Sequence, residues 1–241
     1  MKNMTDPQPK GTHLALVNED MPDEIEVDGA VWKKIREYKH DFFAATGSYK
    51  SSDGRKAMLK IYRPNWWYCV PAFLLSYWWV RHEKKVYDKM EDTGYTPRFL
   101  GRYKKTGMLI EFIESVNLLD KPDLNSDFFD TLEKIIGTMH ERGIAYVDAD
   151  KPDNFLASID GRPYVIDFQL TWVQPFFPLS LLTWPIFAIL ADADTYHISK
   201  HRRRFLRHEN LPKYMPWYIR IHRYFSVRFR KFRHRFMPNY H

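Results

Sequence analysis

One acidic segment contains the residues of this sequence that are best suited to catalysis. From Ala145 to Gln169 the chain reads AYVDADKPDNFLASIDGRPYVIDFQ, with five aspartates and one asparagine around two short apolar runs. Carboxylate and amide oxygens are ligands that Mg²⁺ prefers, and a carboxylate can also accept the proton of a hydroxyl group. The segment fits two interpretations, a polar hairpin or a site that holds a metal ion and phosphate.

The residues that precede this segment predict a sheet and a helix. An Asp-Gly pair at 53–54 is a hairpin signal between two alternating runs within 31–63. Lys60 lies on the second of these strands, where the neighbouring positions are apolar. A helix is expected over about 73–92, because a glycine and a proline follow that stretch. Two further strands are expected over 97–114.

A second helix and a second hairpin are expected further along the chain. Apolar residues recur at helical spacing between 125 and 143, and Gly143 is expected to end that helix. Two short strands within 154–168 are joined by an Asp-Gly pair at 160–161. Beyond Phe168 the pattern predicts aromatic helices broken by prolines. This order of elements predicts an α+β fold with a sheet in front and helices behind.

In this order the residues resemble the protein-kinase-like family. Lys60, in AMLKI, resembles the strand lysine of the V-A-I-K motif, and Glu83 in the following helix resembles its ion-pair partner. VDADKPDN resembles the catalytic loop, and IDFQ, which contains Asp167, resembles the metal-binding D-F-G segment. The resemblance covers about 31–170. It implies a two-lobed fold with a small antiparallel sheet lobe and a shortened helical C-lobe.

The resemblance also implies that the protein uses ATP and Mg²⁺. Lys60 would neutralise phosphates of ATP, and Glu83 would hold that lysine in place. Asn154 and Asp167 would bind Mg²⁺, and Asp148 would take the proton of the acceptor hydroxyl. Further contacts to the nucleotide or its phosphates would come from Lys151 beside the transferring phosphate, Gly47 in a loop over the phosphates, and Glu111 in the hinge segment EFIE.

The catalytic loop departs from the family pattern by one position. The catalytic aspartate usually precedes the asparagine by five residues, but Ala149 occupies that position here. Asp148 lies six residues before Asn154 and Asp150 lies four before it, so both are candidates for the base. Asp148 is favoured because it directly follows the apolar run AYV. Gln169 also replaces the glycine of D-F-G.

The rest of the pattern is reduced as well. Gly47 alone remains of a glycine-rich loop, and no A-P-E-like segment follows Asp167. The sequence is therefore closer to the compact bacterial kinases that act on lipopolysaccharide core sugars, or to RIO-type kinases, than to ordinary protein kinases. The expected division is a flexible arm over 1–28, an N-lobe over 29–115 and a reduced C-lobe over 116–241.

The chain is basic, with a net charge of +7 and a pI of about 9.3, which favours an anionic partner. Thirteen Lys or Arg residues and one acid lie within 200–235. Two stretches, 64–80 and 168–191, carry no charge. The second is either a buried part of the rear lobe or a surface that contacts the membrane interface. An anionic membrane surface is favoured over nucleic acid as the partner.

Cysteine content and the N-terminal composition bear on location. One cysteine, Cys69, excludes an internal disulfide framework and a Cys-based zinc site. The N-terminal segment contains no apolar run of signal-peptide length. We therefore expect a cytoplasmic protein, peripheral on the inner face of the cytoplasmic membrane.

These features together predict an ATP- and Mg²⁺-dependent phosphotransferase. It would act on a hydroxyl of a sugar, a glycolipid or a protein at the membrane surface. Two alternatives stay open. The first is a pseudokinase, meaning a nucleotide-binding or scaffold protein at the membrane. The second is an RNA-binding protein.

Overall fold

The computed structural model describes residues 15–16, 19–64, 72–120, 124–206 and 215–221. The chain forms two compact units. The first contains the residues up to Val116 together with Leu156–Asp160 and Tyr164–Gln169, and the second contains Asn117–Phe155, Gly161–Pro163 and the residues from Leu170 onward. The chain therefore passes between the two units several times.

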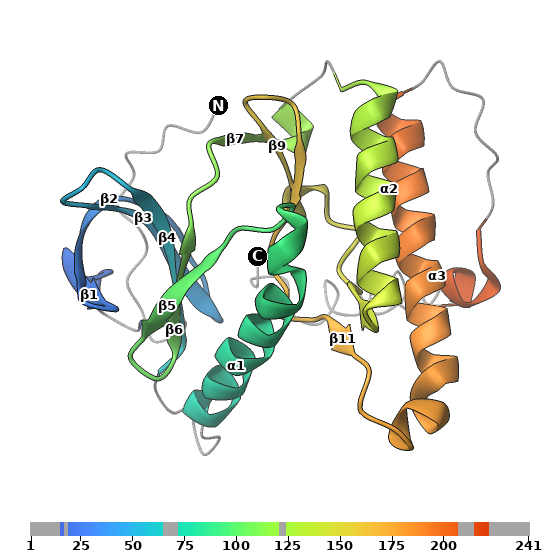
Figure 1. Cartoon of the computed structure of the whole chain (residues 1–241), viewed down its shortest axis with the longest axis horizontal. Coiled ribbons are helices and arrows are strands. Elements are labelled where there is room, and N and C mark those ends of the chain that lie inside the picture. The colour runs from blue at the N-terminus through green and yellow to red at the C-terminus, as the bar shows by residue number, and fades with distance from the viewer. Residues whose placement is uncertain (1–14, 17–18, 65–71, 121–123, 207–214, 222–241) are drawn as a thin grey trace, which may run out of the picture. The chain divides into compact units, whose positions relative to one another are not determined.

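The first unit is built on a six-stranded antiparallel sheet (Figure 1). Its strands follow in the order β1 (Glu24–Val27), β2 (Ala30–His40), β3 (Ala44–Ser51), β4 (Lys56–Tyr62), β6 (Gly107–Glu111) and β5 (Phe99–Tyr103). The predicted hairpins β3–β4 and β5–β6 are both confirmed. The sheet curls so that its two edge strands, β1 and β5, contact each other.

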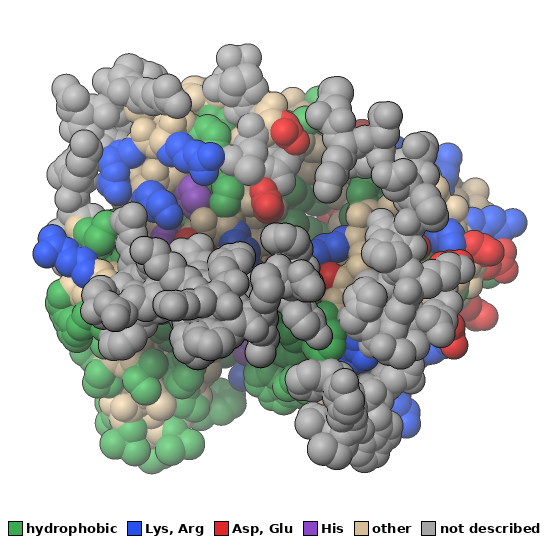
Figure 2. Space-filling model, turned by 180° about the vertical axis from the view of Figure 1, so that it is seen from behind, with side chains coloured by type: hydrophobic (Ala, Val, Ile, Leu, Met, Phe, Trp, Pro, Cys, Tyr) green, Lys and Arg blue, Asp and Glu red, His purple; other side chains and the backbone are tan. Residues whose placement is uncertain are grey.

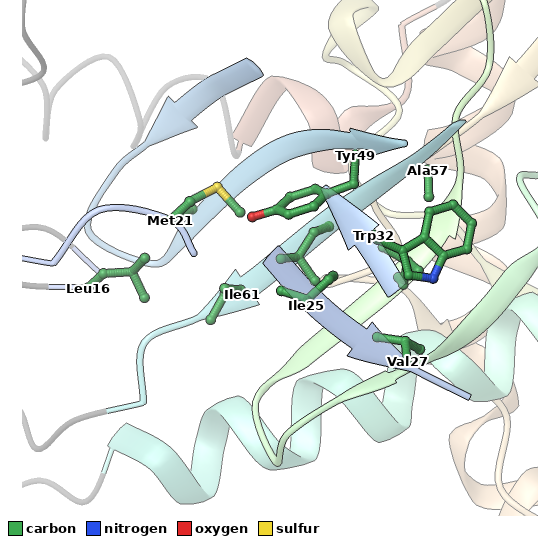
Figure 3. Close-up of a cluster of buried hydrophobic side chains, with 11 residues drawn as sticks. Leu16, Met21, Ile25, Val27, Trp32, Tyr49, Ala57 and Ile61 are labelled. Carbon is green, nitrogen blue, oxygen red and sulfur yellow. The ribbon is translucent and has the colours of Figure 1, made fainter. Parts of the chain in front are cut away.

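Alternating residues of this sheet form one hydrophobic core inside the curl. Along β4, Leu59 and Ile61 are buried on this side, whereas Lys60 faces the other side. Trp32 of β2 and Tyr49 of β3 supply the largest side chains of the core (Figure 3). Burying an apolar side chain of this kind contributes roughly 2 kcal/mol to stability. The core fixes the strand on which Lys60 stands.

The helix of the first unit lies on the sheet. α1 (Ala72–Met90) contacts β4 and β5, and a short 3-10 helix, η1 (Glu91–Thr93), continues it. Gly94 follows at φ 69°, a conformation that glycine adopts without steric cost, and the helix ends there as predicted.

A separate three-stranded sheet contains β10 (Pro163–Val165), β9 (Phe155–Ser158) and β7 (Ser115–Asn117), in that order. The turn between β9 and β10 contains Asp160, which accepts a hydrogen bond from Ser158 at 2.6 Å. The hairpin predicted around the Asp-Gly pair is therefore confirmed.

The prediction of a flexible arm over 1–28 is wrong for 21–27, which lies within the described residues. Met21 is buried, and Glu24–Val27 form β1, paired antiparallel with β2. The run EIEV alternates acidic and apolar residues, so that both apolar side chains enter the core. This alternation is a short strand signal inside a polar segment. Residues 1–14 and 17–18 lie outside the described residues.

The second unit contains two long helices that lie side by side, α2 (Ser126–Glu141) and α3 (Leu179–Phe205) (Figure 1). Asn125 begins α2 by accepting a hydrogen bond from the N–H of Phe128 at 3.0 Å. The predicted amphipathic helix is confirmed, and its buried face consists of Phe128, Phe129, Leu132, Ile135, Ile136 and Met139. Short elements complete the unit: η2 (Leu118–Asp120), β8 (Ile144–Ala145), η3 (Pro152–Asn154) and β11 (Trp172–Val173).

The prediction of aromatic helices broken by prolines is wrong for 179–205 but agrees with a second helical segment, 217–221, which follows Pro216. α3 is a single helix of 27 residues that contains Pro185, while Pro175 and Pro178 precede it. A proline within a helix removes one hydrogen bond, and α3 continues through Pro185 despite this loss. Nor is 168–191 a buried part throughout, since no residue of 176–190 is buried.

None of the described helices is long and apolar enough to cross a membrane. Most of the basic segment predicted to contact an anionic partner lies outside the described residues, at 207–214 and 222–241.

The closed curl of the sheet generates a prediction on two glycines. A Cβ at Gly101 of β5 would lie 2.4 Å from Val27 Cγ1 of β1, whereas a Cβ at Gly137 of α2 would meet nothing within 4 Å. Gly101→Ala should therefore lower the free energy of unfolding by roughly 2 kcal/mol. Gly137→Ala should raise it by roughly 0.5–1 kcal/mol, because alanine favours a helix. Urea denaturation measures both values. Equal effects of the two substitutions would contradict the contact between β1 and β5.

Candidate active site

The first unit brings Lys60 to two carboxylates. Its Nζ lies 2.8 Å from Glu83 Oε1 and 2.8 Å from Asp167 Oδ1. The side chain of Lys60 is 12% exposed, and that of Glu83 is 0% exposed. The expected ion pair between β4 and α1 is therefore present, and Asp167 shares it. The roles of these residues toward a nucleotide stay predictions.

Three donors hold the buried carboxylate of Glu83. Besides Lys60, the hydroxyl of Tyr62 donates to Oε1 and the N–H of Phe168 donates to Oε2 at 3.3 Å. Burial raises the pKa of Glu83 to about 7, although Lys60 favours the ionised form. Burial also disfavours the ammonium of Lys60, but the carboxylates of Glu83 and Asp167 outweigh it and raise the pKa of Lys60 above its ordinary value. Lys60 therefore carries its charge at neutral pH.

Asp167 stands in the left-handed backbone conformation, with φ 62°. Aspartate tolerates this conformation better than most residues. The next residue, Phe168, is fully buried, and its ring meets that of Tyr87 on α1 edge to face, with 4.9 Å between the centroids. This contact fixes the segment, while the carboxylate of Asp167 stays 39% exposed and accessible to a cation.

In the second unit, the loop after β8 gathers Asp148, Lys151 and Asn154. Lys151 Nζ lies 2.8 Å from Asp148 Oδ2, and Asn154 Nδ2 donates to the same oxygen at 3.1 Å. Because a carboxylate oxygen accepts, the amide nitrogen of Asn154 must face it, and Oδ1 is the atom that can turn to a cation. Asp148 is buried in this cluster, whereas Asp150, the other candidate base, is exposed.

A strained turn positions Asp148. Its N–H donates to the carbonyl of Tyr146 at 2.8 Å around Val147, whose φ of 69° is rare for a β-branched residue. Asp194 of α3 is fully buried and accepts hydrogen bonds from the N–H groups of Tyr146 at 2.6 Å and Val147 at 2.8 Å. His140 Nε2 lies 3.1 Å from the same carboxylate. Asp194 is thus a positioning residue for the loop.

α3 supports the loop at a second point. His201 Nε2 donates to the carbonyl of Ala149 at 2.9 Å, and burial lowers the pKa of His201, so its imidazole is neutral at neutral pH. The sequence did not lead us to Asp194 or His201. Together with Ile198 they form the buried face of α3, at spacings of four and three residues. Their helical spacing with the apolar Ile198 is the sequence signal that could have identified them.

One predicted nucleotide contact, Gly47, lies elsewhere than expected. Gly47 is predicted in a loop over the phosphates, but it lies within β3, paired with both neighbouring strands. A Cβ there would come within 3.0 Å of the Arg36 carbonyl and of Met21 Sδ, so glycine permits close packing and its placement in a loop is wrong. Glu111 ends β6, where its carboxylate pairs with Arg98 at 3.3 Å.

The turn between β2 and β3, at 41–43, contains no glycine. Asp41 Oδ1 accepts hydrogen bonds from the N–H groups of Phe43 and Ala44, each at 2.9 Å. In a glycine-rich loop such N–H groups face phosphate. Here a carboxylate of the chain itself takes both of them.

Each unit, taken by itself, offers a donor group of a kind that Mg²⁺ prefers. Asp167 offers a carboxylate oxygen, and Asn154 offers an amide oxygen. Among the described residues, no three His, Cys, Asp or Glu side chains gather into a metal cluster. Mg²⁺ usually keeps waters and substrate phosphates in its shell, so it can be bound through few protein ligands.

Solved structures that are similar to this chain include two of a kinase. One is the crystal structure of the Rio2 kinase-ADP/Mg²⁺-phosphoaspartate complex from Chaetomium thermophilum, with a TM-score of 0.56 and 15% identity over 76% of this chain and 58% of that chain. The other is the Rio2 kinase from the same organism, with a TM-score of 0.52 and 16% identity over 73% and 58% of the two chains. The chain thus spans 58% of the length of these kinases. No protein-family model matches the sequence, and a search of curated proteins found no similar one.

These similarities establish a protein-kinase-like fold, composed of a curled antiparallel sheet with one helix and a helical region. The predicted fold class and the resemblance to the kinase-like family are confirmed. The closer resemblance to bacterial lipopolysaccharide kinases stays a prediction.

The buried ion pair generates a prediction on coupling. Lys60→Met and Glu83→Leu should each lower the free energy of unfolding by roughly 3 kcal/mol, because each leaves a charged partner buried. The double variant should lose no more than the worse single variant, since it removes both charges. Chemical denaturation of the four proteins gives the coupling energy. Additive losses would contradict a direct interaction.

The contact of His201 generates a prediction on pH. Its pKa is lowered by folding, so as pH falls below its ordinary value of 6.5 the unfolded chain takes up the proton first. The stabilising contribution is complete above that pH and declines below it. His201→Gln keeps a donor but does not titrate. The excess stability of the wild type over this variant should shrink by up to about 1 kcal/mol per pH unit below 6.5.

The other histidines are identical in both proteins and cancel in this comparison. The measurement extends to about pH 5.5, which is about one unit below the ordinary pKa of histidine. If the difference in unfolding free energy between the two proteins stays constant from neutral pH to that point, His201 is not neutral and buried as described.

Proposed function

We propose that this chain is an ATP- and Mg²⁺-dependent phosphotransferase that acts on a hydroxyl group. The observation that carries the proposal is the buried lysine of β4 between two carboxylates, Glu83 and Asp167, in a protein-kinase-like fold. A strongly perturbed group of titratable side chains is typical of functional sites. The similar Rio2 kinase is a complex with ADP and Mg²⁺, which supports the choice of nucleotide and metal.

Lys60 binds the phosphates in this proposal. Its charge is permanent at neutral pH, and its strand is fixed by the core beneath it. Glu83 is fully buried and stays with the lysine, whereas Asp167 is partly exposed. Phosphate oxygens can therefore replace Asp167 beside Lys60 without disturbing the pair on α1.

Asn154 and Asp167 would hold the magnesium ion. When bound, the ion would neutralise the negative charge that develops on the phosphates during transfer. Contacts within the chain already hold both of these ligand residues in place. Asp148 fixes the amide of Asn154, and the packing of Phe168 fixes the backbone of Asp167.

Asp148 orients the acceptor hydroxyl and takes its proton. Two donors, Lys151 and Asn154, hold its carboxylate, and Asp194 holds the turn before it. Lys151 is 57% exposed and can move its charge to the transferring phosphate. The acceptor is a hydroxyl of a sugar, a glycolipid or a protein.

A pseudokinase is the second candidate, and one observation favours it. The N–H groups of Phe43 and Ala44 bond Asp41, in the turn where active kinases cover the phosphates with a glycine-rich loop. A chain that binds nucleotide without this loop could serve as a scaffold. Turnover separates the two candidates.

The test is hydrolysis or transfer of the γ-phosphate of radiolabelled ATP in the presence of Mg²⁺. Asp148→Asn should lower turnover at least about a hundredfold while nucleotide binding persists, because the general base is lost. Asp150→Asn is the matched control in the same loop and should stay within about twofold of the wild type. Nucleotide binding without any turnover by the wild type would favour the pseudokinase. Loss of turnover in Asp150→Asn alone would assign the base to Asp150.

A further inference from the structure

The first turns of α3 and the residues before them form an apolar surface whose large side chains are exposed. Phe176 is 87% exposed, Phe177 78% and Leu182 77%. Figure 2 shows hydrophobic side chains gathered over the end of the second unit where α3 begins. We call residues 176–186 the α3 tip; its exposed large side chains are Phe176, Phe177, Leu179, Leu181, Leu182, Trp184 and Ile186.

The α3 tip extends beyond the helix on which α3 packs. Phe205 stacks on Phe129 near the start of α2, and Asp194 and Phe187 contact His140 near its end. α2 ends at Glu141, so residues 179–186 continue past it, as Figure 1 shows. Eight helical residues are about 12 Å long.

The apolar side chains of the tip point in opposite directions. Leu182 and Trp184 are two residues apart, which places them on opposite sides of a helix, and both are strongly exposed, at 77% and 63%. A protein groove covers one side of a helix, whereas a fluid medium surrounds it. No charged residue occurs from Phe168 to Ala191, so the whole tip can leave water without burying a charge.

We propose that the α3 tip inserts into the interfacial region of a lipid bilayer that contains anionic lipid. Interfacial segments enter about 5–10 Å, which the tip can reach, while spanning the hydrocarbon core requires about 30 Å. Tryptophan, here Trp184, favours this zone. The net charge of +7 attracts the chain to an anionic surface. The inference does not depend on the proposed phosphotransferase activity.

The test is co-sedimentation of the full chain with vesicles of phosphatidylcholine and phosphatidylglycerol. Leu182→Asp places a charge in the tip and should weaken vesicle binding about tenfold or more. Ile159→Asp is the matched control, because Ile159 is 76% exposed in the turn between β9 and β10. It should bind vesicles within about twofold of the wild type. Both positions are exposed, and circular dichroism verifies that both variants are folded.

Three results would overturn the proposal. The first is wild-type protein that does not bind the vesicles. The second is Leu182→Asp that binds them as tightly as Ile159→Asp does, which would assign binding to charge alone. The third is self-association that Leu182→Asp abolishes while vesicle binding stays, which would make the tip an interface between two copies of the chain. ATP turnover is measured in the absence of vesicles, so failure here is distinct from failure of the proposed activity.

Discussion

The buried pair of Lys60 and Glu83 is the interaction on which the rest of the structure depends. Removing two charges from water costs several kcal/mol per ion, and their attraction compensates only in a fixed geometry. The core beneath β4 fixes one partner, and α1 and the N–H of Phe168 fix the other. Because apolar residues of similar size would often be as stable, this arrangement indicates a requirement for a permanent positive charge at that place.

The second unit shows the same principle in the loop that follows β8. Val147 holds a backbone conformation that costs energy, and the hydrogen bonds that Asp194 accepts from the N–H groups of Tyr146 and Val147 stabilise it. Asp194 and His201 both come from the part of α3 that packs on α2. The second half of α3 therefore supports the loop through buried polar contacts, whereas its first turns belong to the exposed apolar α3 tip.

Local chemistry was predictable from the sequence, and tertiary context was not. The Asp-Gly turns and the helix of α2 follow from short patterns. The resemblance to the protein-kinase-like family indicated Lys60, Glu83 and Asp167, and the structure brings these three residues together. Gly47 was misplaced because a glycine needed for close strand packing looks like a loop glycine. Asp194 depends on which face of α3 meets the loop. The exposure of the α3 tip depends on α3 being longer than α2. Neither the role of Asp194 nor the exposure of the α3 tip can be derived from one sequence.

The central claim is that the cluster of Lys60, Glu83 and Asp167 receives the phosphates of a magnesium nucleotide. Isothermal titration calorimetry with ADP, in the presence and absence of Mg²⁺, tests it most directly. The partly exposed Asp167 repels phosphate until a cation lies between them. The account therefore predicts binding that weakens about tenfold or more without Mg²⁺ and is lost in Lys60→Met. Equal affinity with and without the metal, unchanged in Lys60→Met, would contradict it.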